Sequence, residues 1–116
     1  MQRKLIETPN GAIAVFHSDT PCFTDGQSAL EFAVNAGASC IVLNKEALSE
    51  DFFKLSTGVA GEVVQKFVNY GYRLVVVGDF SQYTSKPLHD YLFECNNGRQ
   101  LNFVATEAEA VQRLSG

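Results

Sequence analysis

The 116-residue chain lacks tryptophan and has few basic side chains: nine lysines and arginines stand against thirteen acids, for a formal net charge of −4. Proteins that bind nucleic acid through its phosphates carry clustered positive charge, so this balance argues against such binding. No apolar run approaches the ~20 residues that cross a bilayer, and no apolar leader follows the first charged residues. We therefore expect a cytoplasmic protein that contacts neither nucleic acid nor membrane.

Cysteine is scarce as well. Cys22, Cys40 and Cys95 are far apart and odd in number, a pattern that fits neither a zinc site nor a disulfide framework. Cys40 lies in an apolar run and Cys95 at helical spacing from other apolar residues, so both are expected in the core. Cys22, in a loop, is the candidate for a reactive thiol. We expect no bound metal and no cofactor.

Apolar side chains, by contrast, are abundant. They make up 46% of the chain, against 19% charged residues, as in one packed domain over residues 1–116 without a linker. Two strand-like runs at residues 4–7 and 12–17 flank Asn10-Gly11 and predict a β-hairpin.

Helices and short apolar runs alternate after the hairpin. The capping box Thr24-x-x-Gln27 predicts the start of a first helix, which ends at Gly37. A second helix covers residues 57–70, a third follows Ser85, and a fourth follows the box Thr106-x-x-Glu109. Continuous apolar runs predict buried parallel strands at residues 39–43, 73–77 and 101–105.

The resulting order, β-β-α-β-α-β-α-β-α, predicts an α/β fold with a mixed, mostly parallel sheet covered by helices. In such sheets, sites form outside the carboxyl ends of the parallel strands. Three loops meet at that edge, at residues 18–26, 44–57 and 78–85.

The tripeptide Ser56-Thr57-Gly58 opens the second helix. The simplest interpretation is that a hydroxyl caps the helix, which contributes ~1 kcal/mol. Alternatively, an anion binds the free backbone N–H groups, or Thr57 accepts a covalent phosphate. A nucleophilic hydroxyl would need a nearby base, and neither His17 nor His89 forms a recognisable motif with it.

Glycines and a lysine nearby also have two interpretations each. Gly58 and Gly61 either let the helix pack closely on the sheet or leave room for a ligand or a partner backbone. Asn44 and Lys45 directly follow a buried strand, and Lys45 is either a solvated loop residue or a ligand for an anion at the helix start.

The loop at residues 78–86 is the most polar of the three, and its candidate residues are Asp79, Phe80, Ser81, Tyr83 and Ser85. Asp79 either binds a ligand or closes a backbone turn with its carboxylate. Phe80 and Tyr83 either pack on the core or anchor a partner.

A further candidate, Asp51, lies beside Phe52 and Phe53. An extended segment cannot bury both rings, whereas a turn can; an exposed ring would indicate a protein interface.

The central unit resembles the STAS domain of sulfate-transporter tails and anti-sigma-factor antagonists. The unit contains a buried strand (CIVLN), the start Ser56-Thr57-Gly58, an apolar helix ending at Gly71 and a strand ending in VVVGDFS. In antagonists the motif is an aspartate, two hydroxyl residues and a glycine, and the hydroxyl residue before the glycine accepts a phosphate from a kinase. The resemblance implies this role for Thr57, although Leu55 occupies the aspartate position.

Two longer segments resemble a family of small bacterial proteins, the domain-of-unknown-function family 4180. They are DFFKLSTGVAGEVVQKF and VVVGDFSQYTSKPLHDYLFECNNGR. This resemblance covers much of the chain and implies no activity.

Taken together, these patterns favour a non-enzymatic regulatory or protein-interaction module that uses residues 51–61 and 78–86. We expect a protein partner with basic groups; homodimerisation is a further option. The alternative is an anion- or small-molecule-binding protein, or an enzyme, with Lys45 and Asp79 in one pocket at the strand ends. A closed pocket holding both residues would favour this alternative, and an exposed Phe53 or Phe80 would favour the module.

Overall fold

The structure is a computed structural model that describes residues 3–115. It contains five strands, which are β1 (Arg3–Thr8), β2 (Gly11–Phe16), β3 (Cys40–Asn44), β4 (Arg73–Val77) and β5 (Leu101–Val104). The four α-helices are α1 (Gly26–Ala36), α2 (Val59–Tyr70), α3 (Lys86–Asn96) and α4 (Glu107–Ser115). Three short 3-10 turns, Lys45–Ala47, Glu50–Phe53 and Leu55–Thr57, connect β3 to α2.

The strands form one sheet in the order β1-β2-β3-β4-β5. β1 and β2 pair antiparallel as the predicted hairpin, and every later neighbour pairs parallel. The α/β fold with a mixed, mostly parallel sheet is therefore confirmed, and so is the order of its elements.

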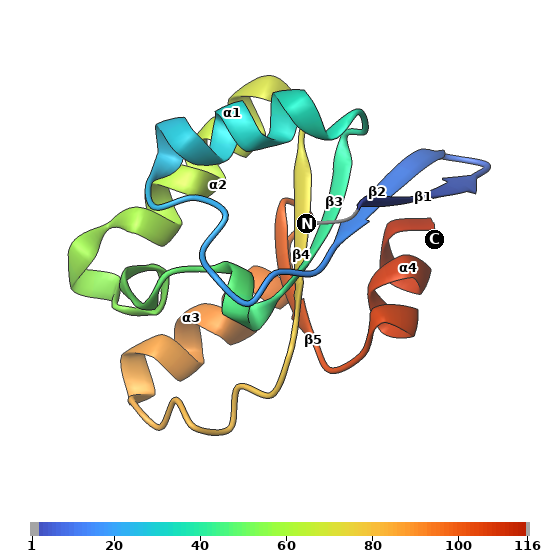
Figure 1. The fold of residues 1–116 in the computed structure, drawn as a ribbon. Helices are drawn as coiled ribbons and strands as arrows, with labels where there is room; N and C mark the ends of the chain where they lie inside the picture. Colours follow the sequence, from blue (N-terminus) through green and yellow to red (C-terminus); the bar gives the residue numbers. More distant parts are fainter. Residues whose placement is uncertain (1–2, 116) are drawn as a thin grey trace.

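The helices divide unequally between the two faces of the sheet (Figure 1). The crossovers from β2 to β5 all advance in the same direction along the sheet, and right-handed connections then put α1, α2 and α3 on one face. α4 follows the last strand and packs on the opposite face, where Ala110 and Leu114 contact Ile13, Val42 and Val75.

Coverage of both faces explains the continuous apolar runs. Along β3, Ile41 and Leu43 belong to the core under α1, α2 and α3, whereas Val42 belongs to the core under α4. All three side chains are at most 2% exposed. A strand buried on both faces has no position for a polar side chain, so alternation disappears.

One predicted helix start needs correction. The N-cap of α1 is Asp25 and not Thr24, because Asp25 is the extended residue before the helix, with φ −151°. Its Oδ1 accepts from the Ser28 backbone N–H at 2.8 Å, and the Ser28 hydroxyl accepts from the Asp25 N–H at 3.1 Å. Ser28 therefore takes the place predicted for Gln27 in the capping box.

The predicted helix ends agree with the structure, whereas the predicted burial of two cysteines does not. Gly37 and Gly71 end α1 and α2 in the left-handed region, with φ of 82° and 76°, as predicted. Cys40 and Cys95, expected in the core, are only half-buried at its margin. Cys22 is also half-buried, and this burial raises the pKa of its thiol, which disfavours the reactive thiolate.

Candidate functional site

The Thr57 side chain closes a turn and does not cap α2 in the predicted way. Its hydroxyl lies 2.6 Å from the Asp51 carbonyl oxygen and 2.8 Å from that of Lys54, so its single hydrogen is shared between two acceptors. Its Oγ1 also accepts from the Val59 N–H at 3.3 Å, at the first residue of the helix. The residue immediately before α2 is Gly58, which has no side chain to cap with.

The two glycines of this segment do not serve close packing. A Cβ added at Gly58 or Gly61 would meet no atom within 4 Å. Gly58 is needed for its backbone, because its φ is +76°. The close approach of helices occurs at Gly26 instead, where a Cβ would lie 2.8 Å from that of Glu62 on α2. The close-packing prediction for Gly58 and Gly61 is therefore wrong.

The segment around Thr57 is exposed, whereas the two rings before it are not. Phe52 and Phe53 are 2% and 5% exposed, because the 3-10 turn Glu50–Phe53 points both rings inward. Within the range 51–61, the exposed positions include Asp51, Leu55, Ser56, Thr57, Gly58 and Gly61. We call this exposed segment the Thr57 turn.

Phe53 joins the Thr57 turn to the 78–85 loop. Its ring stacks on that of Tyr83, with centroids 4.8 Å apart and an interplanar angle of 15°, and lies 6.0 Å from the ring of Phe80. Phe80 and Tyr83 are half-buried and belong to the core margin. The Phe53 ring therefore links the two segments below one surface, but it is buried and Phe80 is half-buried, so neither is the exposed ring that would favour a protein interface.

Lys45 is tied into this surface and is not a free anion ligand. Its Nζ donates to the Asp79 carbonyl oxygen at 3.0 Å and to Gln82 Oε1 at 2.9 Å. The same ammonium lies 5.4 Å from the centroid of the Tyr83 ring. Gly78 permits this approach, since a Cβ there would lie 2.7 Å from that of Lys45. Lys45 thus holds the 78–85 loop against the turn after β3.

Asp79 closes a backbone turn, and this contact weakens it as a base. Its Oδ1 accepts from the Ser81 backbone N–H at 2.9 Å. The hydrogen bond stabilises the charged carboxylate and lowers its pKa below the ordinary value. A carboxylate with a lowered pKa holds a proton poorly at neutral pH, so the geometry gives no support to general-base chemistry at Asp79.

Asn44 and Ser85 also have structural contacts. Asn44 Oδ1 accepts from the Ser18 backbone N–H at 2.9 Å, and its Nδ2 donates to the Ser18 carbonyl at 2.7 Å. This pair of bonds fixes the loop after β2 to the end of β3. Ser85 precedes α3, as predicted, but its side chain makes no capping hydrogen bond.

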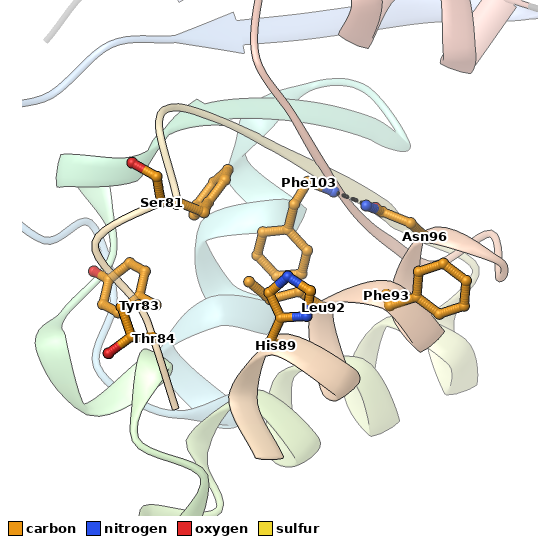
Figure 2. A pocket seen from close by; sticks show the side chains of 9 residues that line it. Ser81, Tyr83, Thr84, His89, Leu92, Phe93, Asn96 and Phe103 are labelled. Carbon is orange, nitrogen blue, oxygen red and sulfur yellow. Dashed lines mark hydrogen bonds between the residues drawn. The ribbon is translucent and has the colours of Figure 1, made fainter. Parts of the chain in front are cut away.

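Two adjacent cavities lie at the carboxyl ends of β4 and β5, and Phe80 and Phe103 line both. The larger, about 550 Å³, lies between the 78–85 loop and α3. Figure 2 shows Ser81, Tyr83 and Thr84 on one side of it and Phe93 and Asn96 on the other, with Phe103 between them. The second cavity, about 480 Å³, includes Asp79 and Glu109.

Sequence reasoning missed the α3 and β5 side of these cavities, which includes His89, Phe93, Asn96 and Phe103. A signal was available in the order of elements. β4 leads to α3 on one face and β5 leads to α4 on the other, so their carboxyl ends form the topological switch point where crevices open.

Lys45 and Asp79 do not line one pocket. Lys45 borders a separate cavity of about 430 Å³, together with the acidic residues Asp19, Glu46 and Glu50. Within residues 3–115, no group of three or more histidine, cysteine or acidic side chains has a metal-binding arrangement. No helix in the same range is long and apolar enough to cross a membrane.

A family model described as a domain of unknown function, DUF4180, matches residues 8–114. The chain belongs to the DUF4180 family. The resemblance of its two long segments to that family is thereby confirmed. A comparison of this DUF4180 chain with curated proteins finds no match.

The DUF4180 chain is also similar in structure to a candidate anti-sigma factor antagonist from Thermotoga maritima, solved by crystallography. The similarity has a TM-score of 0.51 at 14% identity and covers 98% of this chain and 95% of the other. At this identity the likeness establishes the STAS-like fold alone.

Proposed function

We propose that this DUF4180 chain is a non-enzymatic regulatory module that binds a protein partner through the Thr57 turn and the adjoining 78–86 segment. One observation carries the proposal: the Thr57 hydroxyl closes a turn that is itself exposed. A chemical change at this one oxygen would therefore alter the shape of the surface. The proposal includes a cytoplasmic location and a single domain over residues 1–116.

Phosphorylation of Thr57 is the regulatory step that we propose. An ester at Oγ1 removes the O–H donor that the Asp51 and Lys54 carbonyls share, and it adds nearly two negative charges. The turn would open and become more acidic, so affinity for a partner would change. Leu55 stands where antagonists of this fold have an aspartate, so the kinase would have to recognise the turn by other contacts.

Charge supports a partner with basic side chains. Asp19, Glu46 and Glu50 border the cavity of about 430 Å³ next to the Thr57 turn. The one lysine that lines this cavity, Lys45, already donates to Gln82 and the Asp79 carbonyl. Complementary charge raises the association rate and favours the correct partner.

The test uses tagged wild-type chain and three variants as bait in native-host lysate, with bound proteins quantified by mass spectrometry. We expect a partner that wild type and Ser56→Ala retain and that Thr57→Glu loses; Thr57→Ser, which keeps the hydroxyl, should retain it. Urea unfolding of each bait separates loss of binding from loss of the fold. A set of bound proteins that is the same for wild type and a folded Thr57→Glu variant would overturn the proposal.

A second candidate function, binding of a small aromatic molecule, is favoured by the cavities at the β4–β5 switch point. Their volumes fall within the range of ligand sites, and aromatic rings and a few polar groups line the larger one. A thermal-shift screen of aromatic compounds tests this function. A true ligand should lose its effect in Phe93→Ala and keep it in Val68→Ala, since Val68 is exposed on α2, outside the residues that line the larger cavity.

A further inference from the structure

The two edges of the sheet are protected unequally. At the β5 edge, the Phe103 backbone N–H donates to Asn96 Oδ1 at 2.7 Å, so a side chain from the end of α3 occupies a strand donor. Asn102 Nδ2 donates to the Cys95 and Gly98 carbonyls and holds the α3–β5 connection on the same edge. Covering of this kind prevents another strand from pairing there.

The β1 edge has no such cover. β1 is the last strand in the order, and the backbone of Arg3–Thr8 makes no hydrogen bond to any element other than β2 within the described residues. In an antiparallel pair, every second residue of an edge strand turns its N–H and C=O away from its neighbour. The hairpin also extends beyond the other strands (Figure 1), and Leu5 on it is 44% exposed.

We propose that β1 pairs antiparallel with β1 of a second copy of the chain, about a two-fold axis that passes through Leu5. Such a dimer would join two five-stranded sheets into one and cover the uncovered backbone donors and acceptors of both. Among the registers that keep each face on its own side, the one centred on Leu5 opposes Arg3 to Glu7, although it also opposes Lys4 to Ile6.

The face of the sheet on which each β1 side chain lies limits the choice of register. Arg3, Leu5 and Glu7 lie on the α1 side of the sheet, because Leu5 and Arg3 stand opposite Ala14 and Phe16 of the core under α1. Ile6 packs on the α4 side. A two-fold axis perpendicular to the sheet keeps each face on its own side, so opposed residues must belong to the same face.

Charge selects among the remaining registers. Centring on Lys4 would oppose two lysines, and centring on Ile6 would oppose Leu5 to Glu7. Centring on Leu5 opposes the two Leu5 side chains and places Arg3 of each copy opposite Glu7 of the other. Opposite charges across a strand pair stabilise it and like charges destabilise it.

Arg3 has one hydrogen bond within its own chain. Its Nη1 donates to the Ala36 carbonyl at 2.7 Å, at the end of α1 and on the β3 side of β1, so the side chain must turn towards the β1 edge to meet Glu7 of a second copy. A guanidinium has five N–H donors, so others remain for a carboxylate. The Glu7 carboxylate makes no hydrogen bond or ion pair within residues 3–115 and is available to accept them.

Charge reversal provides the first test, by sedimentation of the full chain over a range of concentrations. Wild type should dimerise, and Glu7→Arg or Arg3→Glu should each weaken the dimer about tenfold, since two attractive pairs become repulsive. An equimolar mixture of these two variants should form a heterodimer of near wild-type strength. Circular dichroism checks that Arg3→Glu, which also loses the Ala36 contact, still folds.

Cross-linking tests the register independently. Under mild oxidation, Leu5→Cys should give a disulfide between two copies at residue 5, identified by peptide mass. Glu7→Cys should not cross-link to itself, because position 7 stands opposite Arg3. A monomer at every concentration up to the solubility limit, a dimer indifferent to both charge reversals, or preferential cross-linking at position 7 would each overturn the proposal.

Discussion

Residue 58 is where the chain leaves a 3-10 turn and enters α2, and its φ of +76° is one that side chains with a Cβ rarely adopt. Gly61, three residues later, lies inside the helix with open space around it. The same residue type therefore has opposite energetic consequences at the two positions.

We predict that Gly58→Ala destabilises the fold by about 1 kcal/mol, because alanine is strained in the left-handed region. Gly61→Ala should instead stabilise it by about 0.5–1 kcal/mol, since alanine is the better helix former. Urea unfolding of both variants measures the two free energies. Changes of the same sign would contradict this account of the segment.

Lowering the pH should reveal how much the hydrogen bond between Asp79 and the Ser81 N–H contributes to stability. The hydrogen bond from the Ser81 N–H lowers the pKa of this carboxyl, so the stabilisation is complete above the unfolded pKa and is lost as pH falls through the folded pKa. Asp79→Asn can keep the turn but cannot titrate.

We therefore predict that wild type loses more stability than Asp79→Asn between about pH 5 and about pH 2. Unfolding curves across this range give the comparison. Asp51→Asn is the control, because the Asp51 carboxylate accepts no hydrogen bond among the described residues. Identical acid slopes for wild type and Asp79→Asn would be inconsistent with the contact.

At the scale of elements, α1 shows how a cap is chosen. Two neighbouring residues, Thr24 and Asp25, both have side chains suited to an N-cap, and sequence spacing favoured Thr24. In the structure Asp25 alone accepts from the Ser28 N–H, because it is the extended residue at the helix boundary.

Asp25→Ala should accordingly destabilise the protein by about 1 kcal/mol. Thr24→Ala should change the free energy of unfolding by less than about 0.5 kcal/mol, as at an ordinary surface position. Thermal and urea unfolding of the pair decide between the two residues. A larger effect at Thr24 would restore the original interpretation.

At the scale of the whole molecule, the burial of one face of the sheet depends on α4. Among the described residues, this nine-residue helix is the one helix on its face of the sheet, and Ala110 and Leu114 are its buried contacts with β2, β3, β4 and β5. Loss of its packing would expose valines from all three central strands.

Leu114→Ala should therefore cost about 2–5 kcal/mol, since Leu114 is 3% exposed and its neighbours belong to rigid strands. Gln112→Ala, on the solvent side of the same helix, is the matched control and should change stability by less than about 0.5 kcal/mol. Equal effects of the two substitutions would show that α4 contributes little to the core.

Local chemistry made much of the fold predictable. The Asn10-Gly11 turn, the apolar runs of β3 and β4, and the glycines that end α1 and α2 each depend on neighbours a few residues away. Backbone conformation and hydrophobic period act over this distance, so the sequence states them directly.

The candidate site was less predictable, because its contacts join segments far apart in the chain. The sequence leaves Lys45 either solvated or anion-binding, yet its ammonium lies between Gln82 and the Asp79 carbonyl. Phe52 and Phe53 are both buried because a 3-10 turn forms between β3 and α2, which is one of the two alternatives that the sequence could not decide between.

The sequence by itself determined the order of elements, the parallel character of the sheet and the edge at which its loops meet. Tertiary structure alone decided that Thr57 closes a turn, that Phe53 and Tyr83 join two surface segments, and that β5 is covered while β1 is open. The physical reason is range: propensity and periodicity act within an element, whereas side-chain contacts and free strand edges depend on which elements become neighbours in space.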